Sequence, residues 1–161
     1  MIDRAAVKEW KIYLHPCFGS QLIALVDEVE SLRVKHPESY QKKAATKLLA
    51  AVFKVINSEI GADPTQAKFR QGSTLGDHNR HWFRAKFLMQ YRLFFRYSEQ
   101  YKTIILAWMN DSETKRAYGS KRDAYKVFAM MLDGGYPPDD WETLLKQAQA
   151  MDAYHQPDAE R

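Results

Sequence analysis

The chain has a single cysteine, Cys17, and no apolar run long enough to cross a membrane. One thiol cannot form an intrachain disulfide or supply a cysteine-rich zinc site, and a lone cysteine is typical of a reducing compartment. A membrane-spanning helix needs about 20 consecutive apolar residues, and the first residues do not have the pattern of a signal peptide. We therefore expect one soluble, cytoplasmic domain with no membrane anchor.

Acidic residues are scarce in one part of the chain. Residues 80–126 hold eleven Lys or Arg and four Asp or Glu, whereas the whole chain carries a net charge of only +4. A cationic patch on a nearly neutral body attracts polyanions locally, although such a cluster can also be a solvated face. Aromatic residues are interleaved with the cations over residues 82–97, as in surfaces that stack bases and contact phosphates. The pattern favours RNA binding.

Residues 82–97 have the alternation of two β-strands. Arg84 and Lys86 fall on one face of the first strand, and Arg92 and Arg96 fall on one face of the second, because successive strand residues point to opposite sides. The residues between them are mostly aromatic or aliphatic. We therefore expect a sheet with one buried apolar face and one face that carries cations.

The apolar periodicity predicts the order strand, helix, helix, three strands, helix, helix. The predicted strands are residues 7–14, 82–88, 91–97 and 102–109, and the predicted helices are residues 16–36, 38–60, 121–133 and a last helix from Trp141. Asp139 and Asp140 suit the N-terminal end of the last helix. His15 precedes the first helix, where we expect it to order the junction with the strand.

Three consecutive strands with short turns form an antiparallel meander. We therefore expect an α+β fold, in which the N-terminal strand joins an edge and a helical hairpin packs on an antiparallel sheet of about four strands, with the helices on one face. Residues 1–161 are expected to form one domain, with a core at about 7–133 and a C-terminal helical extension at about 134–155.

The sequence also has few metal ligands near its cations. The basic region offers Asp111 and Glu113 after its last strand and no paired-histidine spacing. Metal-dependent phosphodiester cleavage needs several converging carboxylates. We therefore expect neither a metal nor any other cofactor.

Several blocks of residues, up to about residue 143, carry a resemblance to a known family. They are Trp10, Tyr13 and His15-Pro-Cys-Phe18, then Glu38–Ala50, Tyr91–Ser98, Trp108–Asp111 and Pro137–Thr143. The chain resembles the RelE/ParE superfamily of bacterial toxins and, within it, the YhaV toxin family. The resemblance implies an endoribonuclease that cleaves messenger RNA, inhibits translation and growth, and is neutralised by a PrlF-like antitoxin.

RNA can be cut without a metal when its 2′-hydroxyl attacks the adjacent phosphate, and cations then stabilise the developing charge. The resemblance to RelE-type toxins places an arginine of a Tyr-Arg-Leu motif in the catalytic cluster, and Arg92 matches it; Arg84 lies on the neighbouring strand. It places further basic and tyrosine groups after the last strand, where the candidates are Lys115, Arg116, Tyr118 and Tyr125. We assign RNA binding to Lys86, Arg96, Arg80 and His81.

Alternatives accompany these assignments. Each arginine can instead form a structural ion pair, and Tyr125 can pack in the core. The segment before the last two helices is longer than in the shorter superfamily members, so the equivalent tyrosine is either Tyr118 or Tyr125.

Two other functions are open to the same sequence: a non-catalytic RNA- or ribosome-binding module, and the gyrase poisoning of another superfamily branch, which the number of cations disfavours. An antitoxin can cover residues 84–118 or dock on the hairpin 22–60. The sequence does not choose between these surfaces, nor does it show whether cleavage requires the ribosome.

Overall fold

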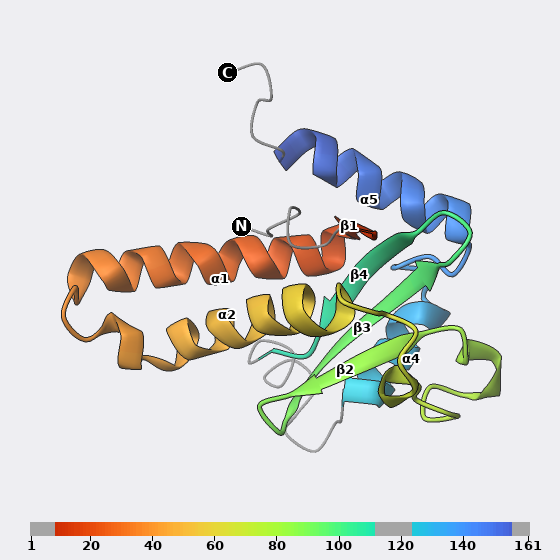
Figure 1. The fold of residues 1–161 in the computed structure, drawn as a ribbon, viewed down its shortest axis with the longest axis horizontal. Coiled ribbons are helices and arrows are strands. Elements are labelled where there is room, and N and C mark those ends of the chain that lie inside the picture. Colours follow the sequence, from red (N-terminus) through yellow and green to blue (C-terminus); the bar gives the residue numbers. More distant parts are fainter. Residues whose placement is uncertain (1–8, 112–123, 156–161) are drawn as a thin grey trace.

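The computed structural model of the chain describes residues 9–111 and 124–155, and a four-stranded sheet lies at its centre (Figure 1). The strands are β1 (Lys11–Leu14), β2 (Phe83–Phe87), β3 (Tyr91–Ser98) and β4 (Thr103–Met109), in the order β1-β4-β3-β2. β2, β3 and β4 form the predicted antiparallel meander. β1 joins an edge as predicted, but it runs parallel to β4, so the sheet is mixed.

Helices cover both faces of this sheet, so the prediction of helices on one face is wrong. α1 (Pro16–Lys35) and α2 (Ala44–Lys54) lie in front of the sheet in Figure 1, and α4 (Ala124–Asp133) lies behind it. β4 shows the physical reason, because all seven of its residues are buried. Ile104 packs into the core beneath α1 and α2, whereas Ile105 packs into the core beneath α4. A strand that is apolar on both sides must be covered on both.

The predicted helical hairpin is confirmed, with different bounds for its second arm. α1 follows the prediction closely, and the Nδ1 atom of His15 accepts a hydrogen bond from the backbone of Cys17 at 3.1 Å, which caps its first turn. The second arm begins with a 3₁₀ turn, Tyr40–Lys42, before α2, because Lys43 has an extended backbone that interrupts the helix. A π-helical turn, Val55–Ile60, ends it before Gly61.

The last helix, α5 (Trp141–His155), packs along α1 and β1. Asp140 precedes it and accepts a hydrogen bond from the backbone N–H of Thr143 at 2.9 Å, which is the expected capping arrangement. The Met151 side chain of α5 fills the space beside Gly19 of α1: a Cβ atom on Gly19 would lie 2.1 Å from its sulfur, so a larger residue there would displace this side chain. Among the helices of residues 9–111 and 124–155, none is long and apolar enough to span a membrane.

Candidate active site

Two arginines from neighbouring strands converge on one tyrosine behind the sheet. The Nε atom of Arg84, on β2, donates a hydrogen bond to the phenol oxygen of Tyr125 at 2.8 Å. The Nε atom of Arg92, on β3, donates to the same oxygen at 3.3 Å. α4 holds the tyrosine in place, and its ring packs edge-on against Phe94 with 5.7 Å between the ring centroids. Three predicted catalytic residues therefore meet at one point.

Backbone carbonyl groups hold each guanidinium in a fixed orientation. Arg84 is only 9% exposed, and its Nη1 atom donates to the carbonyl oxygens of Lys68 and Arg70 at 2.9 and 3.0 Å. The Nη1 atom of Arg92 donates to the carbonyl oxygens of Met89 and Tyr91 at 3.0 and 2.9 Å. Within the described part of the chain, neither Nη2 atom has a hydrogen-bond partner. Two N–H groups of each arginine are thus left for a ligand.

No acid within residues 9–111 or 124–155 neutralises the charges of these arginines. Neither arginine forms an ion pair with any carboxylate that the structure describes, so the structural alternative of an ion pair is not what is observed there. Carbonyl oxygens orient a guanidinium without removing its charge. The cluster therefore presents two fixed positive charges, as a phosphate-binding site requires.

Tyr125 has one hydrogen-bonding function left. Its oxygen already accepts hydrogen bonds from two guanidinium groups, which occupy the directions of its lone pairs. The phenol hydrogen remains available as a donor, because a tyrosine hydroxyl donates one bond and accepts up to two. The half-buried Tyr125 can therefore give a hydrogen bond, or a proton, to an oxygen bound beside the arginines.

Lys86 adds a third cation to the same face. It is exposed and pairs directly with Arg92 across β2 and β3. Like charges placed directly opposite each other on a sheet destabilise it. A bound polyanion would attract both cations and so offset this repulsion.

Arg96 and His81 lie in a second cluster, at the other end of the cationic face. The Arg96 guanidinium is sandwiched between the rings of Trp82 and Trp141, at 5.4 Å from each centroid, and donates to the backbone oxygen of Asp139. Burial lowers the pKa of Arg96, against the attraction of Asp139 and Asp140. Arg96 therefore anchors the start of α5 to the sheet, and the alternation of the sequence did not reveal this role.

Asp139 holds the second cluster together. Its Oδ1 atom lies 2.6 Å from the Nε2 atom of His81 and accepts a hydrogen bond from the indole N–H of Trp82 at 3.0 Å. Burial alone would raise the pKa of Asp139, but these hydrogen bonds and the neighbouring positive charges outweigh it and lower the pKa. Arg80 is exposed and pairs with Asp77 at 3.1 Å.

The two clusters follow one another along the same face of the sheet. Arg92 and Arg96 are four residues apart on β3, which is about 13 Å of strand. Arg84 pairs with Phe94 across β2 and β3, so it lies between these two arginines along the face.

Sequence reasoning missed two buried amides that support the site. Asn110, directly after β4, is 7% exposed; its Oδ1 atom accepts from the backbone N–H of Arg92 at 2.7 Å, and its Nδ2 atom donates to the carbonyl of Gln90 at 2.9 Å. Gln71 bonds the backbone of Leu75, Asn79 and Trp82 and so fixes the loop before β2. The only available signal was the place of Asn110 within the Trp108–Asp111 block.

Three of the predicted catalytic residues, Lys115, Arg116 and Tyr118, lie outside the described residues. In the ranges that the structure describes, no group of three His, Cys, Asp or Glu side chains is placed to hold a metal ion. Burial raises the pKa of the Cys17 thiol to about 11, so this cysteine is not a thiolate nucleophile near neutral pH.

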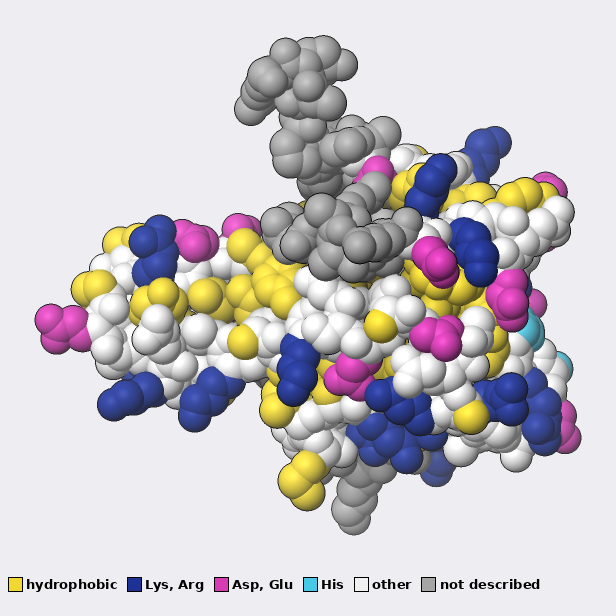
Figure 2. Space-filling model, in the orientation of Figure 1, with side chains coloured by type: hydrophobic (Ala, Val, Ile, Leu, Met, Phe, Trp, Pro, Cys, Tyr) yellow, Lys and Arg dark blue, Asp and Glu magenta, His cyan; other side chains and the backbone are white. Residues whose placement is uncertain are grey.

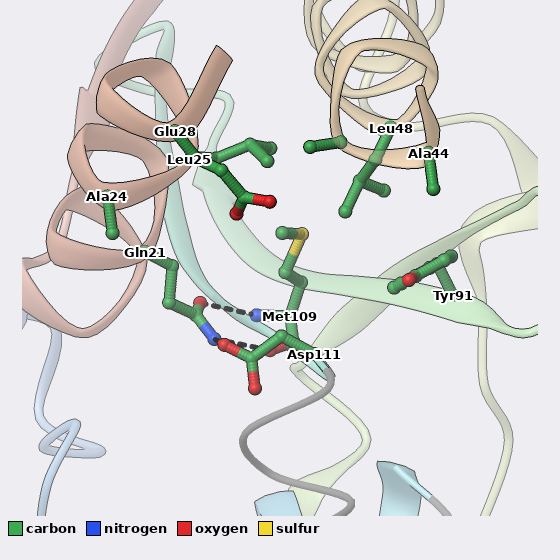
Figure 3. A pocket seen from close by; sticks show the side chains of 10 residues that line it. Gln21, Ala24, Leu25, Glu28, Ala44, Leu48, Tyr91, Met109 and Asp111 are labelled. Carbon is green, nitrogen blue, oxygen red and sulfur yellow. Dashed lines mark hydrogen bonds between the residues drawn. The ribbon is translucent and has the colours of Figure 1, made fainter. Parts of the chain in front are cut away.

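A pocket of about 380 Å³ lies on the opposite face of the sheet, between α1, α2 and the ends of β3 and β4 (Figure 3). Tyr91 lines it, and since the next residue on a strand points the other way, Arg92 does not. Gln21 closes one side by bonding both the N–H and the carbonyl of Met109. The pocket is thus separate from the arginine cluster.

Comparisons with known proteins show the family of the chain. A family model described as a toxin with endonuclease activity, of toxin-antitoxin system, matches residues 12–149. The "Ribonuclease toxin YhaV" of Escherichia coli K12 is 55% identical over 145 residues, which cover 89% of this chain and 94% of the relative. The "Toxin YhaV" of Escherichia coli O6:H1 is 54% identical over the same shares. No solved structure matches the chain. The chain belongs to the YhaV toxin family, whose members are described as toxins with endonuclease activity.

Proposed function

We propose that this chain is an endoribonuclease toxin that cleaves messenger RNA at the cluster of Arg84, Arg92 and Tyr125. The observation that carries the proposal is the convergence of two guanidinium groups on one phenol oxygen, at 2.8 and 3.3 Å. Each guanidinium keeps an Nη2 group for a phosphate oxygen, and no described acid neutralises either charge. The similarity to a relative named as a ribonuclease supports RNA as the substrate.

The proposed reaction needs no metal. The 2′-oxygen attacks the adjacent phosphorus and loses its proton, and the bond from phosphorus to the 5′-oxygen breaks as that oxygen gains a proton. The products are a 2′,3′-cyclic phosphate and a 5′-hydroxyl end. Arg84 and Arg92 stabilise the extra negative charge on the phosphorus oxygens, which is often the largest catalytic contribution.

Tyr125 is proposed to protonate the leaving 5′-oxygen. Both arginines donate to the Tyr125 oxygen, so its phenol hydrogen is still available. This hydrogen lies beside the position where the two arginines would hold the phosphate. The partner that removes the 2′ proton is proposed to come from Lys115 or Tyr118, with Arg116 adding positive charge. These three assignments rest on the family resemblance alone.

RNA outside the reacting phosphate is proposed to follow the cationic face. Lys86 is exposed beside Arg92 and suits the neighbouring phosphate. Arg80 and His81, at the far end of β2, suit a phosphate further along the strand. Arg96, held between two tryptophan rings, would contact RNA only with the N–H groups that Asp139 does not take.

The family membership implies an antitoxin partner. We propose that the partner is a PrlF-like antitoxin. We also propose that the toxin acts in the cytoplasm, on free messenger RNA and on messenger RNA bound to the ribosome. An antitoxin that covers residues 84–118 would block the cations directly, whereas one that docks on the hairpin 22–60 would lie on the opposite face from Arg84 and Arg92. These two modes differ in whether bound antitoxin prevents RNA binding.

The test is RNA cleavage by the purified chain in EDTA, with and without ribosomes. The proposal expects cleavage that leaves 2′,3′-cyclic or 3′-phosphate ends. Cleavage that requires added magnesium would contradict the mechanism. Salt-sensitive binding of RNA without any scission, under both conditions, would instead favour the non-catalytic binding module.

A further inference from the structure

The tip of the hairpin between β2 and β3 exposes two large apolar side chains beside the candidate active site. Met89 is 94% exposed and Leu88 is 51% exposed. Both have a left-handed backbone, with φ angles of 64° and 46°. Figure 2, drawn in the orientation of Figure 1, shows hydrophobic side chains projecting where this hairpin ends.

Neither the conformation nor the exposure of these residues favours folding. A left-handed backbone costs a residue other than glycine about 1 kcal/mol, and hairpin tips of this kind prefer Asn, Asp or Gly. An apolar side chain that stays in water contributes nothing to the core. Unfavourable backbone conformations that persist without a packing benefit are concentrated at functional sites.

The tip is also tied to the catalytic arginine. The Nη1 atom of Arg92 donates to the carbonyl of Met89, and the Nδ2 atom of Asn110 donates to the carbonyl of Gln90. The N–H of Gln90 bonds the carbonyl of Leu88 at 2.7 Å. Any ligand held by Arg92 therefore lies next to a tip whose backbone is fixed to the same guanidinium.

We propose that Leu88 and Met89 contact a base of the RNA next to the cleaved phosphate and help to choose and orient it. Apolar side chains that project beside phosphate-binding cations can press against a base face or separate two stacked bases, as leucine and methionine do in other nucleic-acid-binding proteins. This inference rests on the proposed ribonuclease function and assigns the part of the site that touches a base.

An RNA base fits the tip better than a protein partner does. Two side chains offer far less surface than the roughly 800 Å² that each partner buries in a stable protein interface. The neighbouring groups are cations, Lys86 and Arg92, whose natural ligand is a phosphate backbone. A base attached to that backbone would reach the tip, and it would not need the large contact surface that a protein partner requires.

The test is a double variant, Leu88→Asn with Met89→Gly, which places favourable turn residues at the two left-handed positions. We expect the melting temperature to be unchanged or raised. We expect kcat/KM for RNA cleavage to fall about tenfold, as for the loss of one base contact. The matched control is Tyr101→Ala, which removes an exposed aromatic side chain from the turn at the other end of β3 and should cleave as the wild type does.

A second comparison uses an RNA oligonucleotide that lacks the base on one side of the mapped cleavage position, with each side tested in turn. One of these RNAs should be cut more slowly by the wild type but at an equal rate to the intact RNA by the double variant. Equal cleavage of intact RNA by the wild type and the double variant would overturn the proposed base contact but not the proposed ribonuclease function. So would a double variant that cleaves normally but escapes its antitoxin, since the tip would then contact protein. A wild type that does not cleave RNA would contradict the proposed function itself.

Discussion

The backbone N–H of Arg92 donates a 2.7 Å hydrogen bond to the side-chain oxygen of Asn110. The side-chain nitrogen of Asn110 donates to the carbonyl of Gln90, so one buried side chain holds the backbone on both sides of Tyr91. It thereby fixes the start of β3, from which the Arg92 guanidinium reaches back to the carbonyls of Met89 and Tyr91. The hydrogen bonds of Asn110 go to Arg92 and Gln90, so it positions the arginine that contacts Tyr125.

We predict that Asn110→Ala lowers the free energy of unfolding by about 1–3 kcal/mol, because the backbone of Arg92 and of Gln90 each lose a hydrogen bond to a buried side chain. It should also lower kcat more than it raises KM. In an Arg92→Gln background the same substitution should lower kcat no further, because its effect passes through Arg92. Cleavage kinetics of the two single variants and the double variant check this.

Gln21→Ala is the matched control for Asn110. Gln21 holds the N–H and the carbonyl of Met109 with its own amide, at 3.1 and 2.6 Å, but on the face away from the arginines. We expect it to reduce stability while the folded fraction keeps its kcat. A Gln21 variant that loses kcat as severely as the Asn110 variant would show that Asn110 acts only through general stability.

Tyr125→Phe keeps the ring that packs against Phe94 and removes the hydroxyl. We predict a fall in kcat of about 10²-fold to 10⁴-fold, the usual range for losing a general acid, with little change in the binding of uncleaved RNA. An RNA with a better leaving group at the 5′-oxygen should recover part of the loss. Tyr91→Phe, on the opposite face, is the control, and an equal loss in both variants would argue against a role in proton transfer.

Lys86→Thr removes one of two cations that face each other across β2 and β3. We predict that the free energy of unfolding rises by about 0.2–1 kcal/mol, since the repulsion between Lys86 and Arg92 is relieved. RNA affinity should fall, and the slope of log Kd against log salt should decrease by about one ion. Binding titrations over a range of salt concentrations measure this, and an unchanged slope would remove Lys86 from the RNA-binding face.

His15 predicts a pH dependence of stability. Burial lowers its pKa below the ordinary 6.5, although its hydrogen bond with Gln147 acts in the other direction. The unfolded chain therefore binds a proton at His15 more readily than the folded chain does. The resulting stability is fully present above pH 6.5 and is lost as the pH falls below it towards the folded-state pKa.

Urea unfolding at pH 7.5 and 5.5 measures this effect. His15→Asn keeps a side chain that can cap α1, and we expect it to show a smaller loss of stability over this range than the wild type. His36→Gln, an exposed position at the end of α1, should keep the wild-type dependence. If the His15 variant has the wild-type dependence, the buried imidazole is not its source.

The sequence predicts the faces of those strands in which apolar and polar residues alternate. Alternation in residues 82–97 gave β2 and β3 with Arg84, Lys86, Arg92 and Arg96 on one face, because that face is fixed by the period of a strand. The continuous apolar sequence of β4 indicated burial but not which helices cover each side. The placement of α4 and α5 on the second face depends on tertiary packing, including the contact of Gly19 with Met151.

The site was only partly predictable for a similar reason. The residue types of Arg84 and Arg92 indicated phosphate contacts, and the family resemblance made Tyr125 one of two candidate tyrosines. Their meeting depends on α4 crossing the sheet at Phe94. The position of Arg96 between Trp82 and Trp141 arises because α5 returns to the sheet from far along the chain. Asn110 and Gln71 act through backbone atoms, which no pattern of side chains reveals.

The most direct test of the central claim is RNA cleavage in EDTA by the wild type, Arg92→Gln and Arg33→Gln. Arg33 lies on α1, outside the cluster, and pairs with Glu30 at 2.8 Å. The Arg33 variant therefore loses one positive charge that does not belong to the cluster. We predict that the wild type and the Arg33 variant cleave at similar rates, while Arg92→Gln is at least about 10² slower. Cleavage by Arg92→Gln at the wild-type rate, or a wild type that is inactive until magnesium is added, would contradict metal-independent cleavage at the arginine cluster.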